Sequence, residues 1–228
     1  MKYLIVNADD FGTSYSINRG IIEAHKHGIV TSASLLVGSR WSKDAAALSR
    51  TVPDLSVGLH VHISSTGGDC MIDFRRRLRE ELNDQFSHFQ ELMDRPPTHI
   101  DSHHNIHRNP EALPEFIDFA QQYNLPLREY SSIRYLSKFY GQRDGQTDVE
   151  QISIENLMQI LEAEVNEGIT EMSCHPGFAD IDLTTRYSLE REIELRTLCD
   201  PLAKQGLIEQ SIQLINYCEY AALVSCLV

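Results

Sequence analysis

The chain has 228 residues, which is enough for one large domain that buries its core without disulfide staples. Lys and Arg number 20 and Asp and Glu number 33, so the formal net charge is −13. A chain this acidic is unsuited to polyanionic partners, because nucleic acid and anionic membranes would repel it. The hydrophobic content of 42% exceeds that of disordered chains, and no apolar run approaches the ~18 residues that a membrane span needs.

The N-terminus and the cysteines predict a cytoplasmic protein. The short apolar run 3–6 leads straight into Asn7, Asp9 and Asp10, so the segment has no long hydrophobic core of a signal peptide. The five cysteines are odd in number and form no CxxC pair, which is typical of reduced thiols. Base rates for oligomeric enzymes are compatible with a homodimer.

Short apolar runs alternate with longer segments of helical periodicity. Strands are expected at 2–10, 31–37, 56–63, 98–103, 127–131, 169–174 and 212–217. Helices are expected between them at 14–28, 42–49, 74–94, 111–123, 153–167 and 187–205, with a short helix after the last strand. This alternation predicts parallel βα units with right-handed crossovers. Because no Gly-rich nucleotide loop occurs, the pattern favours a β/α barrel over an open doubly wound sheet, and no linker divides residues 1–228.

Acidic and imidazole side chains collect where the predicted strands end. The first strand ends in Asp9 and Asp10, and the third carries His60 and His62. Further along the chain, Asp101 and His103 end the fourth strand, His104 and His107 follow it, Arg128 falls in the fifth and His175 follows the sixth. Because the carboxyl ends of parallel strands meet at one face of the fold, we expect these side chains to form one site.

Imidazole and carboxylate together are suited to metal-assisted hydrolysis. They are the common ligands of zinc and other first-row divalent ions, and a carboxylate and a histidine outside the ligand set would serve as base and acid. Each group also has a structural interpretation. The Asp9-Asp10 pair could cap the next helix, although Ser14 or Thr13 could do so instead, and Asp101 could orient a ligand histidine. The coincidence of four strand ends favours a functional site.

These segments resemble the YdjC-like carbohydrate deacetylase family, whose best-known members are chitooligosaccharide deacetylases. The resemblance is carried by Leu4–Gly12, Gly58–His60, Pro97–His104 and Cys174–Gly177, in the family's order over about three-quarters of the chain. It implies a distorted seven-stranded parallel β/α barrel of the glycoside hydrolase/deacetylase type. It also implies hydrolytic removal of N-acetyl groups from amino sugars or short chitooligosaccharides, with one divalent ion, Mg²⁺ or Zn²⁺.

The resemblance also implies roles for individual residues. Asp10, His60 and His103 match the metal ligands, and Asp9 matches the general base. His175 is placed to act as the acid or to steady the departing amine, and Arg128 matches a basic position that orients the base or the substrate. Substrate contacts at the same mouth are expected from His62, Asp101, His104 and His107.

Three features depart from the family's pattern. Asn105 stands where a third consecutive histidine is common, the third strand exits through Val61–Ser65, and the segment Ser65–Phe74 is short. These positions would line the sugar subsites, so the exact substrate stays open. The alternatives are another metallohydrolase on a β/α barrel, such as a phosphoesterase or amidase, and a non-catalytic sugar-binding regulator.

Overall fold

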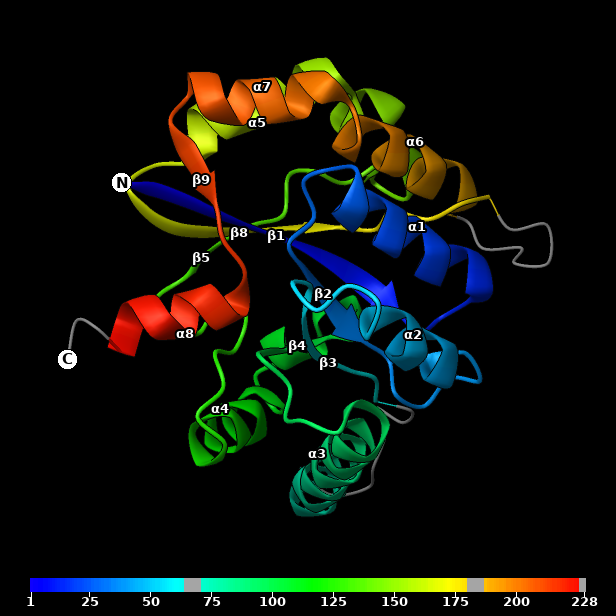
Figure 1. The fold of residues 1–228 in the computed structure, drawn as a ribbon. Helices are drawn as coiled ribbons and strands as arrows, with labels where there is room; N and C mark the ends of the chain where they lie inside the picture. Colours follow the sequence, from blue (N-terminus) through cyan, green and yellow to red (C-terminus); the bar gives the residue numbers. More distant parts are fainter. Residues whose placement is uncertain (64–70, 180–186, 226–228) are drawn as a thin grey trace.

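A curled parallel sheet forms the centre of the molecule, with helices packed around it (Figure 1). The computed structural model describes residues 1–63, 71–179 and 187–225. Most of the expected loop Ser65–Phe74 and the last residues of the C-terminal tail lie outside these ranges. The strand order is β4-β3-β2-β1-β8-β5, and β9 pairs with the first residues of β1. The strands are β1 (Lys2–Phe11), β2 (Ser32–Leu35), β3 (Ser56–Val61), β4 (Ile100–Ser102), β5 (Arg134–Leu136), β8 (Gly168–Cys174) and β9 (Ile212–Leu214).

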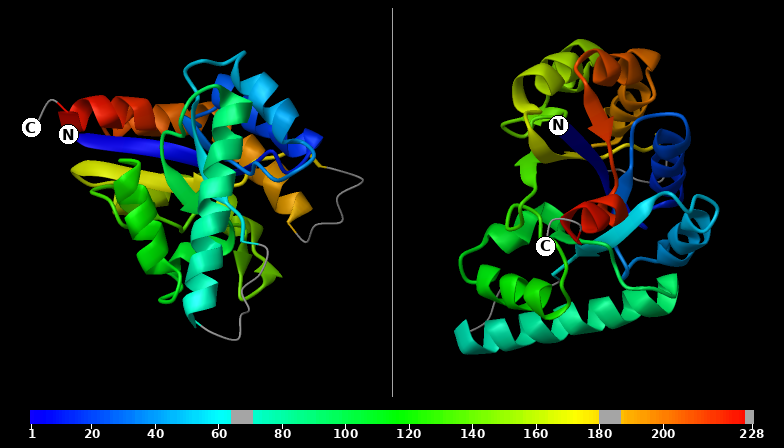
Figure 2. Two further views of the ribbon diagram at one scale, coloured as in Figure 1. Left: turned by 90° about the horizontal axis from the view of Figure 1, so that it is seen from below. Right: turned by 60° about the vertical axis from the view of Figure 1, so that its left-hand side comes forward.

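Strand β1 lies at the centre of the sheet and is buried on both faces. Leu4, Ile5 and Val6 are fully buried, as the uninterrupted apolar run predicts for a strand covered on both sides. It pairs with β2 on one edge and with β8 along Lys2 to Ala8 on the other. Figure 2 shows β1 and β8 running side by side through the molecule. The expected parallel barrel-type architecture is confirmed, as a curled, incompletely closed sheet.

The predicted fifth strand, 127–131, is wrong in its position. Only Leu127 makes a parallel bridge, with Ile100 of β4, and the regular strand β5 begins at Arg134. Glu129 breaks the strand conformation because its φ is +66°, in the left-handed region. The segment between Leu127 and β5 therefore crosses the gap between the two edges of the curled sheet, and it carries Arg128 into the interior.

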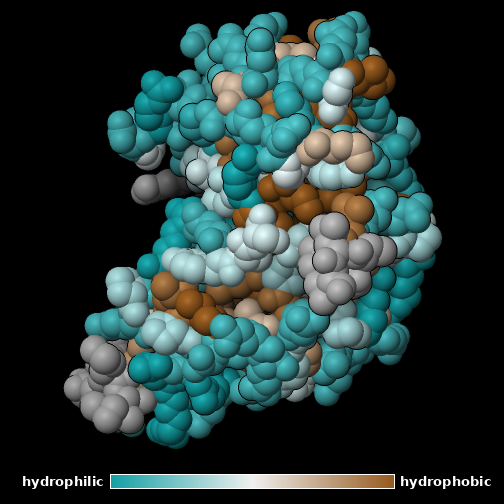
Figure 3. Space-filling view, turned by 90° about the vertical axis from the view of Figure 1, so that its left-hand side faces the viewer, coloured by the Kyte–Doolittle hydropathy of each residue, from teal (hydrophilic) through white to brown (hydrophobic). Residues whose placement is uncertain are grey.

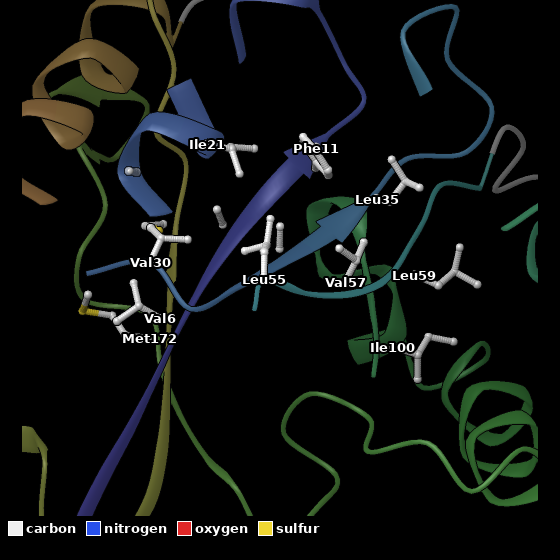
Figure 4. Packing of buried hydrophobic residues seen from close by; sticks show 14 of the residues in the cluster. Val6, Phe11, Ile21, Val30, Leu35, Leu55, Val57, Leu59, Ile100 and Met172 are labelled. Atoms are coloured by element: carbon white, nitrogen blue, oxygen red, sulfur yellow. The ribbon is translucent and has the colours of Figure 1, made fainter. Parts of the chain in front are cut away.

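The helices cover the outer face of the sheet and enclose the core. Figure 4 shows Val6, Leu35 and Leu59 of three neighbouring strands pointing toward the same packed layer. Helix α1 begins at its expected position because the Ser14 hydroxyl accepts a hydrogen bond from the Ile17 N–H. The helices are α1 (Tyr15–Lys26), α2 (Ser42–Ser49), α3 (Met71–Met93), α4 (Leu113–Gln122), α5 (Ile154–Glu164), α6 (Ser188–Leu198), α7 (Pro201–Glu209) and α8 (Tyr217–Ser225), with 3-10 turns η1 (His103–Arg108) and η2 (Val149–Ile152).

The helix expected over 187–205 is two helices. Pro201 occupies the first turn of α7, where its missing N–H costs nothing. The Asp200 side chain caps that helix by accepting from the Leu202 N–H at 2.8 Å. The break allows α6 to run beside α1 while α7 packs against α5 (Figure 1).

A small second cluster closes the end of the sheet where the N-terminus lies. Ile5, Ile133, Ile215 and Tyr217 form it, and Figure 3 shows hydrophobic atoms in a hollow on this face. His99 stacks on Tyr217 with ring centroids 3.7 Å apart, so it supports the base of the sheet. Among the described residues, no helix combines the length and apolarity that crossing a membrane requires.

Candidate active site

Two adjacent aspartates at the end of β1 face the same site because the strand is irregular there. The pairing of β1 with β2 shifts register between Ala8 and Phe11. Asp10 has a φ of +70°, in the left-handed region. In a regular strand Asp9 and Asp10 would point to opposite faces, but here both line one pocket. The strand continues to Phe11, so an irregularity within the strand brings the two side chains together.

Asp10, His60 and His103 form a cluster with one ligand atom each. Asp10 Oδ1 lies 3.4 Å from His60 Nε2 and 3.1 Å from His103 Nδ1. Ligands bound at ~2.1 Å from an ion, at angles of about 90–110°, are about 3.0–3.4 Å apart. The three ligand atoms lie within 4.8 Å of one another. The cluster thus has the donor types and the spacing of a site for one divalent cation.

Neighbouring charged side chains occupy one atom each of His60 and Asp10, and so determine which atom of each residue faces the cluster. His60 Nδ1 lies 2.7 Å from Asp101 Oδ1, which leaves Nε2 facing the cluster. Arg191 binds Asp10 Oδ2 at 2.5 Å, which leaves Oδ1. Burial alone would lower the pKa of His60, but Asp101 and Asp10 raise it to about 10. Burial would raise the pKa of Asp10, and Arg191 reverses this and holds it well below its usual range.

Asp9 is anchored by Arg128, which is only 2% exposed. The guanidinium forms a bidentate pair with Asp9, at 2.8 Å from Nη1 to Oδ2 and 2.7 Å from Nη2 to Oδ1. It also pairs with Asp101 and Glu171, each at 2.7 Å. Burial would raise the pKa of Asp9, but the charge of Arg128 lowers it overall. Asp9 is therefore an oriented, ionised carboxylate.

His175 lies on the other side of Asp9 and is held by helix α6. Its Nε2 is 3.9 Å from Asp9 Oδ2, and its backbone N–H donates to Glu194 Oε2. Nδ1 is buried, 4.0 Å from Glu194 Oε1, and has no hydrogen-bond partner among the residues that the structure describes. Burial lowers the pKa of His175 to about 4, whereas burial raises the pKa of Glu194 to about 7. Burial therefore favours the neutral form of both groups.

A pocket of about 290 Å³ gathers these groups. Of the expected substrate contacts, His104 lines the pocket, and His62 is exposed with its ring 5.6 Å from that of His103. Asp101 and His107 are fully buried outside the lining, because Asp101 binds His60 and Arg128 while His107 Nδ1 lies 2.6 Å from the Ser102 hydroxyl. The structure thus places these two behind the site. The lining is Asp9, Asp10, His60, Ser102, His103, His104, Asn105, Tyr135, Ser137, Tyr140, Ser173, His175, Tyr187 and Arg191.

A left-handed kink directly follows His103. His104 has φ and ψ of 55° and 21°, and Asn105 has 52° and 40°. Asparagine adopts this region more readily than most residues. His103 lies in the turn η1, just beyond β4 and not in the strand 98–103 where it was expected, and its Nδ1 is 3.1 Å from Asp10 Oδ1.

Sequence reasoning missed one wall of the pocket, which helix α6 provides. Tyr187, Arg191 and Glu194 each face the site or its supporting groups. With Glu190 they recur at intervals of three and four residues, so they share one helix face. All four are buried. The signal in the sequence was a helix in which acidic and basic residues recur at helical spacing on one face.

Comparisons with known proteins agree with this geometry. The model of the YdjC-like protein family matches residues 3–209. The chain is 36% identical to a chitooligosaccharide deacetylase of Serratia marcescens, over 95% of this chain and 98% of the relative. It is 33% identical to a carbohydrate deacetylase of Geobacillus stearothermophilus, over 97% and 99%. The structure of an Enterococcus faecalis protein, described as a candidate cellobiose-phosphate cleavage protein, superposes with a TM-score of 0.81 at 30% identity, covering 96% and 98% of the two chains.

Proposed function

Because the chain belongs to the YdjC-like protein family, we propose that it is a metal-dependent carbohydrate deacetylase. Its substrates would be N-acetylated amino sugars or short chitooligosaccharides, and its products acetate and a free amine. The observation that carries the proposal is the pocket itself. One wall presents the Asp10, His60 and His103 cluster, and Asp9 and His175 stand beside it with their side chains 3.9 Å apart.

Asp10, His60 and His103 would hold the ion. A divalent ion there supplies an acidified water and polarises the acetyl oxygen. Two imidazoles and one carboxylate suit Zn²⁺ better than Mg²⁺, which prefers an oxygen-rich shell. Asp101 supports this assignment because a carboxylate on the far nitrogen of a ligand histidine fixes the orientation of its ring. Parallel reconstitution of metal-stripped protein with Zn²⁺ and Mg²⁺ would identify the ion.

Asp9 would remove a proton from the attacking water. Arg128 holds both of its oxygens and keeps it ionised, so it is ready to accept a proton across the neutral range. The same pairing fixes its direction, and Asn7 donates to Oδ1 at 2.9 Å. We assign Arg128 a positioning role because it is buried outside the pocket lining.

His175 would deliver a proton to the departing nitrogen. Its Nε2 is on the pocket side, near Asp9, and its Nδ1 faces the buried Glu194. A proton leaving Nε2 for the amine can be replaced at Nδ1 from Glu194, after a small movement that closes the 4.0 Å separation. Glu194 thus compensates for the burial that lowers the pKa of His175.

The test is acetate release from N-acetylglucosamine and its short oligomers, with phosphate release from sugar phosphates measured in parallel. We expect acetate from at least one acetamido sugar, and no release of phosphate. Asp9→Asn should abolish turnover while the metal:protein ratio stays near that of the unaltered protein. Phosphate release without acetate would replace the proposal with a phosphoesterase. Sugar binding without either product, in metal-loaded protein, would indicate a non-catalytic regulator.

A further inference from the structure

The ring of Tyr140 is held in a fixed orientation at the pocket. One side of it is covered by Tyr187, with ring centroids 4.8 Å apart and planes inclined by 14°. His175 meets it edge-on, at 5.4 Å and 67°. The residue is still 38% exposed and lines the pocket. A rigid aromatic surface therefore stands beside His175 with part of it open to a ligand.

A chain of hydrogen bonds ties this ring to His175. The N–H of Gly141, the next residue after Tyr140, donates to the Tyr187 hydroxyl at 2.6 Å. That hydroxyl donates to Glu194 Oε1 at 2.6 Å, and Glu194 Oε2 accepts from the backbone N–H of His175. The backbone beside the ring and the backbone of His175 are thus attached to one side chain of α6.

The hairpin after Tyr140 is attached to the same helix. Strands β6 (Gln142–Arg143) and β7 (Gln146–Thr147) form it. Glu190 accepts from the Thr147 hydroxyl at 2.6 Å and from Gln142 Nε2 at 3.1 Å, and it is 1% exposed. Burying a carboxylate for this purpose is costly unless it is fully hydrogen-bonded. The two hydrogen bonds to the buried Glu190 carboxylate therefore fix the position of the hairpin on α6.

We propose that Tyr140 is the specificity-determining residue that binds the sugar ring by stacking against its C–H face. This inference rests on the proposed function. It assigns a binding residue to the sugar ring, the part of the substrate that the proposed metal cluster would not contact. Sugar rings present an apolar face of axial C–H groups, and an aromatic side chain with little freedom binds such a face at low entropic cost. Tyr140 therefore selects a pyranose and sets its acetamido group toward His175, with no part in the proton transfers.

Three variants test this role. Tyr140→Ala should raise KM for the acetamido sugar by about tenfold or more, with a smaller loss in kcat. Tyr140→Phe keeps the ring face and should stay within about threefold of the unaltered protein. Tyr130→Ala is the matched control, because Tyr130 is also well exposed (43%) but lines a separate groove beside α4. Inhibition by acetate, which needs no sugar ring, should be the same in all variants.

Sugar binding by calorimetry separates the two proposals. Metal-loaded Asp9→Asn protein should bind the di-N-acetylated disaccharide of glucosamine, and adding Tyr140→Ala should weaken this binding by about tenfold. An unchanged KM and an unchanged affinity in Tyr140→Ala overturn the stacking role, even where acetate release is normal. Equal losses in Tyr140→Ala and Tyr140→Phe also overturn it, because the hydroxyl would then matter and not the ring face. If the unaltered protein releases no acetate but its sugar binding still depends on Tyr140, only the proposed deacetylase activity is overturned.

Discussion

The two walls of the pocket are built on different principles. The strand-end wall carries Asp9, Asp10, His60 and His103, and each acidic or imidazole group has a fixed charged partner. The helix wall carries Tyr187, with Glu194 buried behind it; there, among the described residues, His175 Nδ1 has no hydrogen-bond partner, and burial raises the pKa of Glu194 to about 7. The first wall holds its charged groups in close ion pairs, whereas in the second burial favours the neutral forms of His175 and Glu194.

Because of this difference, we expect the two walls to respond differently to substitution. On the strand-end wall, removing one member leaves opposite charges buried and unpaired, which is strongly destabilising for the cluster. On the helix wall, a neutral isostere can preserve the packing while it removes the proton. The predictions below separate metal binding from proton transfer, in order of decreasing effect.

His60→Ala should produce the largest effect. The substitution removes one ligand atom and leaves Asp101 without its imidazole partner. We expect the metal:protein ratio to fall toward zero and kcat/KM to drop by about a thousandfold or more. Metal analysis with an acetate-release assay on the same sample measures both. His27→Ala is the control, because the side chain of His27 is 64% exposed and pairs with Glu23, far from the cluster in sequence. A normal metal ratio in His60→Ala would refute the ligand assignment.

Glu194→Gln should reduce kcat by about 10- to 100-fold and leave metal content unchanged. The substitution removes the proton held beside His175 Nδ1 without removing a ligand. Glu190→Gln is the matched control, since Glu190 is an equally buried carboxylate on the same helix face that contacts the hairpin and not His175. It should lower kcat much less. Equal loss of kcat in both variants would mean that Glu194 only maintains the structure of the wall.

The sequence predicted the strand-end wall better than the helix wall for a physical reason. Strands alternate faces with a period of two, and parallel strands end at one edge, so Asp9, His60 and His103 could be placed together without coordinates. Helix α6 buries a polar face, and charged residues such as Arg191 and Glu194 are normally solvated. Their burial becomes evident only from the groups that they contact in the folded chain, Asp10 for Arg191 and the backbone of His175 for Glu194. The left-handed turn at Glu129, which moved the fifth strand, depends on tertiary contacts in the same way.

The pH dependence of stability should differ between the unaltered protein and Glu194→Gln. Burial raises the pKa of Glu194 to about 7 from an ordinary value of 4.5, so the folded state binds this proton more tightly than the unfolded chain. The resulting stabilisation is complete below pH 4.5 and is lost as the pH rises to 7. The free energy of unfolding, relative to Glu194→Gln, should fall by about 3 kcal/mol over that range. Denaturant titrations of both proteins at several pH values measure it, and parallel curves would contradict the assignment.

The smallest effect is expected at the kink that follows His103, one of the proposed metal ligands. His104 adopts a left-handed conformation, which costs a residue with a Cβ roughly 1–2 kcal/mol and costs glycine nothing. Glycine also gains entropy in the unfolded chain, so His104→Gly should stabilise the protein by at most about 1 kcal/mol. His104→Ala is the control, because alanine removes the imidazole but keeps the backbone penalty. If both variants change the free energy of unfolding equally, the ring of His104 and not its backbone determines the energetics of the turn. A stabilised glycine variant with normal metal content would show that the strain at His104 is dispensable once the rest of the turn is in place.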